Sequence, residues 1–318
     1  SDNRSSEKSL LREAVSANIS IQKDRAVEIR TVEICVQPPR EPIVMAIKDI
    51  LLHLIDHDDC ATRVDTAIAL AQAHDAHLTG LYALWIPVIP GYVEAQIGAD
   101  ILAQQRAIYT ERAEKAQEQF SKAAQSAGIS FESRCAEGRS DEVLSLHGRY
   151  CDLMLMGRGI TDTMEPSTNL IESVLLQSGK PVMVLPEGAG AAPPGRHVMV
   201  AWNGSRESIR AIDAALPILC AAQQVSLVEV DPANTPGNPL PGADICTHLA
   251  RHGVKINAEG LASHSGSVGE ALLGRAVSDG ADLLVMGAYG HTRWRERILG
   301  GATAHVLEQA KLALLMAH

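Results

Sequence analysis

The chain has 318 residues, more than one ordinary domain uses, and a formal net charge of −10. Apolar residues make up 46% and aromatic residues only 3%, so its cores must be built from Ala, Val, Leu and Ile, with little material for stacking bases. An acidic chain without a basic block argues against a nucleic-acid partner, but it leaves room for a single nucleotide in a local site.

Six cysteines are present, and none forms a C-x-x-C pair or a Cys/His cluster with zinc-ligand spacing. This pattern favours small buried side chains in a reducing cytosol. No apolar run reaches the ~18 residues that a membrane span needs, and no secretory signal is visible. We therefore expect a cytoplasmic protein that does not contact a membrane.

The beginning of the chain differs from the rest. Residues 1–44 are charged and weakly periodic, and they end in the linker-like sequence QPPREP. We expect a disordered, loosely attached extension, with Leu10 to Ile21 as a candidate short helix. Met45 is a natural start for the globular part, so the reason for the extension stays open.

Strands and helices alternate through residues 45–186, the first predicted domain. The expected strands are Ile50–Ile55, His77–Ala83, Ser130–Cys135, Leu153–Met156 and Pro181–Leu185. The expected helices are Ala61–His74, Ile101–Ala127, Ser140–Tyr150 and Asn169–Gln177. Apolar strands without alternation are typical of parallel strands that are covered on both faces.

Residues 187–195 are rich in Pro, Gly and Ala and mark a linker, after which the same order repeats in a second predicted domain, residues 196–318. Its expected strands are His197–Trp202, Val225–Val230, Lys255–Gly260, Leu283–Met286 and Ala313–Met316. Its expected helices are Arg206–Leu219, Ala243–His252, Ser267–Ser278 and Ala302–Gln309.

The repeat is visible in the letters of the sequence. CDLMLMG at Cys151–Gly157 matches ADLLVMG at Ala281–Gly287. The chain is therefore predicted to hold two tandem α/β domains, each a parallel sheet with helices on both faces, because parallel neighbours need crossover helices. The last strand of each domain is the expected edge, where the two copies would pair as an intramolecular pseudo-dimer.

The stretch from Asp282 to Leu307 carries the clearest chemistry. A buried strand ends at Gly287 and Gly290, and a second glycine pair, Gly300 and Gly301, opens a helix. Unpaired amides at a helix N-terminus bind anions, so the pattern predicts a phosphate cradle. It is neither the G-x-x-x-x-G-K-[ST] of a P-loop nor the G-x-G-x-x-G of a Rossmann fold.

The spacing G-x2-G-x9-G, after a strand that ends in Met-Gly, resembles the nucleotide-binding motif of the universal stress protein family. The resemblance covers nearly everything after residue 45. It implies two tandem Rossmann-like, flavodoxin-like domains with five-stranded parallel sheets, ATP or another adenine nucleotide as ligand, and a regulatory role in the stress response. Gly301 stands where the family usually has Ser or Thr, and Thr303 could supply a hydroxyl instead.

Ligands of open parallel sheets bind where the strand order reverses, beyond the carboxyl ends of the strands. By the resemblance, Asn203 lies near the adenosine and the main chain near Val230 contacts the adenine. The full set of expected nucleotide contacts is Ala201, Asn203, Val230, Met286, Gly287, Gly290, His291, Gly300, Gly301, Ala302 and Thr303. Two alternatives stay open: Asn203 to Ser205 could be only a helix-capping turn, and Arg293, Arg295 and Arg297 could be only a solvated loop.

The first domain lacks most of this motif. Gly157 is present, but Ile160 and the pair Thr168-Asn169 replace the later glycines. We expect a structural domain with a degenerate site. A different small ligand under the apolar loop from Trp85 to Ile97 is the alternative.

Three functions fit these observations. The first is a nucleotide-dependent stress regulator with ATP in the C-terminal domain, and the second is a scaffold or partner-binding protein that binds no nucleotide. The third is an enzyme, but the sequence has no G-x-S-x-G, metal-ligand cluster or P-loop, and we predict no catalytic residue and no metal site. Slow ATP hydrolysis, Mg²⁺ on the nucleotide and a homodimer remain open.

Overall fold

The computed structural model describes residues 46–57, 59–87, 99–158, 169–188, 190, 192–230, 242–261, 267–290 and 301–318. The predicted extension at residues 1–44 lies outside the described residues, and so does most of the apolar loop after Pro87. Strands and helices alternate through the described chain, and they form an α/β structure with a mostly parallel sheet.

The first half of the fold contains every predicted strand and helix, with small shifts at their ends. Its elements are β1 (Asp49–Leu54), α1 (Asp59–His74), β2 (His77–Leu84), α3 (Ala99–Ala127), β3 (Phe131–Glu137), α4 (Ser140–Gly148), β4 (Leu153–Gly157), α5 (Leu170–Ser178) and β5 (Val182–Leu185). The helix that was predicted to reach Tyr150 ends at Gly148, and the strand after Ser130 continues to Glu137.

The second half repeats the order. Its elements are β6 (His197–Trp202), α6 (Arg206–Ala221), β7 (Gln224–Val230), α7 (Ala243–Arg251), β8 (Ile256–Leu261), α8 (Val268–Ser278), β9 (Leu283–Gly287), α10 (Ala302–Gln309) and β10 (Ala313–Ala317). Two serines set the starts of helices here. Ser205 Oγ accepts a hydrogen bond from Ser208 N at the start of α6, and Ser267 forms a capping box with Glu270 at the start of α8.

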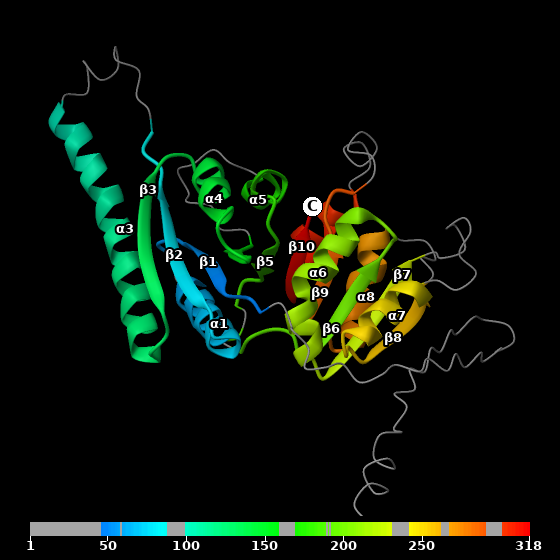
Figure 1. Cartoon of the computed structure of the whole chain (residues 1–318). Helices are drawn as coiled ribbons and strands as arrows, with labels where there is room; N and C mark the ends of the chain where they lie inside the picture. Colours follow the sequence, from blue (N-terminus) through cyan, green and yellow to red (C-terminus); the bar gives the residue numbers. More distant parts are fainter. Residues whose placement is uncertain are drawn as a thin grey trace, which may run out of the picture.

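The strands form one continuous sheet of 10 strands in the order β3-β2-β1-β4-β5-β10-β9-β6-β7-β8. Neighbours within each half run parallel, whereas β5 and β10 pair antiparallel in the middle, with Met183 opposite Leu315 (Figure 1). The expected pairing of the last strands is therefore confirmed. β5 and β10 run in opposite directions. The strands of the first half therefore point their carboxyl ends one way, and the strands of the second half point theirs the opposite way.

Helices cover both faces of the sheet, and each face has its own apolar core. One core lies under α1, α3, α6 and α7, and the other lies under α4, α5, α8 and α10. Successive strand residues point to opposite faces, so Leu51 belongs to the second core and Leu52 to the first. Both cores run through both halves, which makes the junction at β5 and β10 part of the interior.

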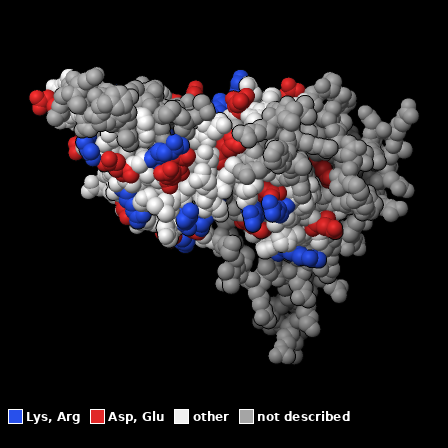
Figure 2. Space-filling view, turned by 90° about the horizontal axis from the view of Figure 1, so that it is seen from above, with Lys and Arg blue, Asp and Glu red and all other residues white. Residues whose placement is uncertain are grey.

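Charged side chains of both signs are mixed on the face drawn in Figure 2, where Lys and Arg lie next to Asp and Glu. On α8, Arg275 Nε and Asp279 Oδ2 form an ion pair at 2.8 Å. Within the described chain, each helix is too short or too polar to cross a membrane.

Candidate functional site

A cavity of about 390 Å³ lies beyond the carboxyl ends of β6 and β9, the neighbouring strands at which the order of the second half reverses. Its lining residues are Ala201, Trp202, Asn203, Val228, Val230, Val268, Leu272, Met286, Gly287, Gly290, Ala302 and Thr303. The structure thus brings together most of the residues that were expected to contact a nucleotide.

The remaining expected contacts fall beside the cavity or outside the structure. Gly301 is the N-cap residue of α10, directly before Ala302. His291 and Gly300 lie outside the described residues, as do the loop arginines at 293, 295 and 297.

Four lining residues were missed by the sequence analysis: Trp202, Val228, Val268 and Leu272. Val228 could have been found, because it precedes Val230 by two positions on β7 and therefore faces the same side of the sheet. Val268 and Leu272 lie one turn apart on α8 and form an apolar wall. Sequence alone does not show which strand an α8 residue will face.

The polar end of the cavity is the N-terminus of α10. Its N-cap, Gly301, makes no side-chain hydrogen bond, and its first turn carries no acidic residue. In α6 and α8, by contrast, a serine side chain accepts from an amide of the first turn. The amides of Ala302 and Thr303 therefore meet the cavity with the positive end of the helix dipole behind them, an arrangement that suits an anion.

Thr303 ties this helix to the glycine turn. Its side chain is buried, and Oγ1 accepts a hydrogen bond from Tyr289 N at 3.4 Å. Tyr289 has a φ of 54°, a left-handed conformation that costs a residue with a side chain roughly 1–2 kcal/mol. Strained residues of this kind cluster where a fold holds a ligand.

The packing of a neighbouring helix explains why residue 287 is a glycine. A Cβ atom on Gly287 would lie 2.5 Å from Ser208 N and 2.6 Å from Glu207 C. Glycine is therefore needed here because the start of α6 packs directly on the end of β9. On Gly290, a Cβ atom would lie 2.8 Å from Glu207 Oε2, the flexible end of a side chain.

Glu207 is a buried carboxylate under this turn. Its Oε1 accepts from Arg206 Nε at 2.5 Å, while Oε2 has no hydrogen-bond partner among the residues that the structure describes. Burial pushes the pKa of Glu207 upward, but the Arg206 hydrogen bond and nearby positive charge outweigh burial, so the pKa lies below its usual value. Glu207 is thus a buried anion under the turn at Gly290.

Asn203 belongs to the turn before α6 and also lines the cavity. Asn203 Oδ1 accepts from Ser205 N at 3.1 Å, which forms the turn before α6, and Ser205 caps that helix. Asn203 also lines the cavity. The same short turn therefore starts a helix and delivers a polar side chain to the site.

His53 occupies the corresponding place in the first half. Ile50 pairs with Leu153 as Val198 pairs with Leu283, so the registers align His53 with Ala201. The imidazole is 5% exposed, and burial, aided by the charge of Arg63, lowers its pKa to about 3. A neutral ring therefore stands where the second half has only a methyl group.

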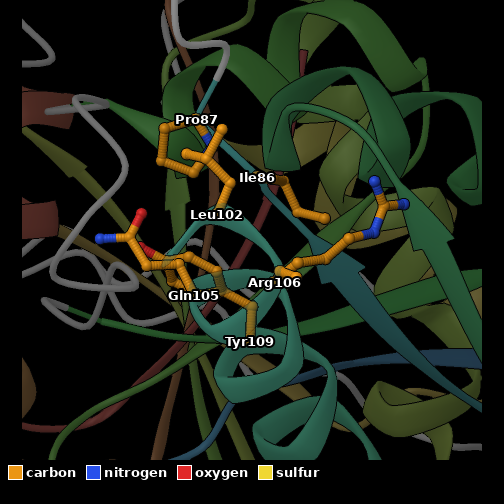
Figure 3. Close-up of a pocket in the computed structure, with 7 residues that line it drawn as sticks. Ile86, Pro87, Leu102, Gln105, Arg106 and Tyr109 are labelled. Atoms are coloured by element: carbon orange, nitrogen blue, oxygen red, sulfur yellow. The ribbon is translucent and has the colours of Figure 1, made fainter. Parts of the chain in front are cut away.

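A second cavity, of about 290 Å³, lies in the first half between the segment after β2 and the first turns of α3 (Figure 3). Ile86, Pro87, Leu102 and Tyr109 line it with Gln105 and Arg106. The guanidinium of Arg106 is directed away from Pro87 and bonds Glu137 at 2.6 Å. The cavity adjoins the start of the apolar loop for which another ligand was considered.

Known proteins resemble this chain in sequence. Residues 195–318 match the sequence model of the universal stress protein family. Universal stress protein Slr1230 of Synechocystis sp. is 28% identical over 149 residues, which are 46% of this chain and 49% of that protein. The chain thus covers about half the length of this curated relative.

Solved structures show the same fold over most of the chain. A universal stress protein from Archaeoglobus fulgidus DSM 4304 matches with a TM-score of 0.66 at 16% identity, over 85% of this chain and 95% of that one. A functionally unknown protein from Pseudomonas aeruginosa PAO1 matches with a TM-score of 0.54 at 16% identity, over 86% of this chain and 93% of that one. Likeness at this identity concerns the fold.

Proposed function

Because residues 195–318 match the universal stress protein family, we propose that this second half of the chain binds ATP or another adenine nucleotide. The protein would then act in the stress response as a regulator whose state depends on the bound nucleotide. The first half would take no nucleotide and would keep a structural role.

The observation that carries this proposal is the two-part character of the cavity. Apolar walls from β7, β9 and α8 form a slot of the kind that holds a flat base, and the uncapped end of α10 offers amides to phosphate. At about 390 Å³ the cavity is in the range of small-molecule sites. Asn203 lies within reach of a ribose placed between the two parts, because it lines the same cavity.

Mg²⁺ fits this site as a companion of the phosphates. No group of three or more His, Cys, Asp and Glu side chains in the described chain is arranged to hold a metal ion. Mg²⁺ in nucleotide sites is usually held by phosphates, water and one or two carboxylates. Glu207, whose Oε2 lies beside Gly290 and has no partner in the described part of the chain, is a carboxylate that would hold it, and the ion would neutralise phosphate charge.

The second candidate is a scaffold that binds a protein partner and no nucleotide. Gly301 favours it, because a Ser or Thr hydroxyl at this place would have given phosphate one more hydrogen bond. A measurement of nucleotide affinity distinguishes the two proposed functions.

The test is a calorimetric titration of the purified protein with ATP, with and without Mg²⁺, after bound nucleotide has been removed. We expect one ATP per chain for the wild type. The variant Ala201→Leu should weaken ATP binding at least about tenfold, because it adds three carbons inside the slot. Its matched control is Ala221→Leu at the exposed end of α6, which should bind as the wild type does.

Two results would contradict the proposal. Absence of binding by the wild type at millimolar ATP would shift the function to the scaffold. Equal affinity in Ala201→Leu and the wild type would place the ligand elsewhere. Chromatography of material released by denaturing the freshly purified protein identifies any nucleotide that it carries.

A further inference from the structure

The helix that closes the candidate site is held at its far end by the other half of the molecule. Arg158 follows β4 in the first half, and its Nη1 donates to the carbonyl of Glu308 at 3.0 Å and to that of Ala310. These are terminal carbonyls of α10, which the helix itself leaves unpaired. The last turn of α10 has no basic residue of its own.

The antiparallel junction explains how Arg158 reaches this position. Arg158 N donates to Leu185 O at 2.9 Å, so the residue stays at the end of β5. Val184 of β5 lies opposite Leu314 of β10, and β10 begins where α10 has just ended. The carboxyl end of the first half therefore meets the C-terminus of α10, while the N-terminus of α10 faces the cavity.

The matching position in the second half cannot make the same contact. The residue that corresponds to Arg158 in the repeat is Ala288, which follows Gly287 and whose N–H donates to Ala317 O at 2.8 Å. Its side chain carries no charge. The first half thus supplies a cation to a helix of the second half. The residue at the matching position of the second half supplies no charge to the first half.

We propose that Arg158 is a positioning residue for the nucleotide site, and that the first half serves the second through it. This inference rests on the proposed function. A cation at the C-terminus of a helix offsets the negative end of the dipole and fixes the last turn. α10 has 8 residues and is about 12 Å long, and a short helix whose last turn is fixed presents its first amides in one orientation.

If Arg158 has this role, its substitution should weaken the binding of the phosphates of ATP and leave the binding of the base unchanged. We would titrate ATP and adenosine into the wild type, Arg158→Met and Arg158→Lys. Loss of the guanidinium in Arg158→Met should weaken ATP roughly two- to fivefold and leave adenosine unchanged. Lysine keeps the charge and should recover part of the ATP affinity. Arg112→Met, on the exposed face of α3, is the matched control and should change neither affinity.

Hydrogen exchange of the nucleotide-free protein tests the mechanical part independently. Amides of α10 should exchange faster in Arg158→Met than in the wild type, while those of α8 stay unchanged. Unaltered ATP affinity, an equal fall for adenosine, or unaltered exchange in α10 would each overturn the inference. If the wild type binds no ATP, the proposed function is wrong. The hydrogen-exchange result then decides by itself whether Arg158 stabilises α10.

Discussion

A single side chain marks the difference between the two halves at the residue scale. Ala201 lines the cavity of the second half, and His53 fills the matching place in the first. Burying an imidazole removes it from water, which disfavours the charged form. The pKa of His53, about 3 in the folded protein, is therefore well below its ordinary value of 6.5.

This shift predicts that the protein loses stability in acid. Between the two pKa values, about 3 and 6.5, the unfolded chain binds a proton at His53 that the folded chain does not. The free energy of unfolding therefore falls as the pH drops through this window, by up to about 1.4 kcal/mol per pH unit. The variant His53→Leu should lose about 2 kcal/mol less than the wild type between pH 7 and pH 5, measured by urea denaturation.

The exposed residue His252 provides the control for this measurement. His252→Leu should follow the wild type at both pH values. If His53→Leu also follows the wild type, His53 is not the group whose protonation opposes folding.

Sequence reasoning located many of the site residues because glycine spacing and strand ends are local signals. Gly287, Gly290 and Thr303 were identified in this way, and the cavity contains all three. The packing of α6 on Gly287 was not predictable, because it depends on how a distant helix crosses the strand. The role of His53 was missed for the same kind of reason, since strand register became known only from the sheet.

At the element scale, the start of a helix affects both its stability and the shape of the candidate site. α8 begins with a capping box, in which Ser267 Oγ accepts from Glu270 N at 3.2 Å and Glu270 Oε2 accepts from Ser267 N at 2.9 Å. Val268, directly after the cap, and Leu272, one turn later, form a wall of the cavity. A stable start of α8 therefore supports the site as well as the helix.

We expect Ser267→Ala to lower the free energy of unfolding by about 1 kcal/mol, because an amide of the first turn loses its partner. Hydrogen exchange in the first turn of α8 should become faster, and ATP affinity should fall slightly if the proposed site is correct. Ser278→Ala is the matched control: Ser278 Oγ donates only to Gly274 O, at 3.0 Å, near the other end of the helix. Equal stability of the two variants would contradict the role of the cap.

The alternation of elements was predictable from apolar runs bounded by Gly and Pro, and the predicted order is confirmed in both halves. Boundaries were less accessible where a helix ends without a strong signal. The helix predicted to run to Tyr150 stops at Gly148, although Arg149 still has helical φ and ψ, a difference of two residues that is common at fraying helix ends. The pairing of β5 with β10 was expected from the repeat, since an unpaired edge invites a partner.

The whole molecule has one sheet and two cores that pass through both halves. Such continuity predicts one cooperative unfolding unit. Leu155 is fully buried in β4 of the first half, and Leu155→Ala should cost about 2–5 kcal/mol. We expect this loss to appear equally in the hydrogen-exchange protection of β7, in the other half.

The matched variant in the second half is Val285→Ala, a fully buried residue of β9. It should reduce protection in β2 of the first half in the same manner, by a smaller amount. If each variant affects only its own half, the halves unfold separately and the junction does not couple them.

The junction of β5 with β10 inside one polypeptide has a consequence for how the two copies can change. When identical chains associate, each substitution appears on both sides of the axis, so a residue that helps one copy and harms the other is ruled out. A duplicated and joined chain is free of this restriction, and its copies stay together at any dilution. His53 at the position that corresponds to Ala201, and Arg158 at the position that corresponds to Ala288, are differences that two identical chains could not have.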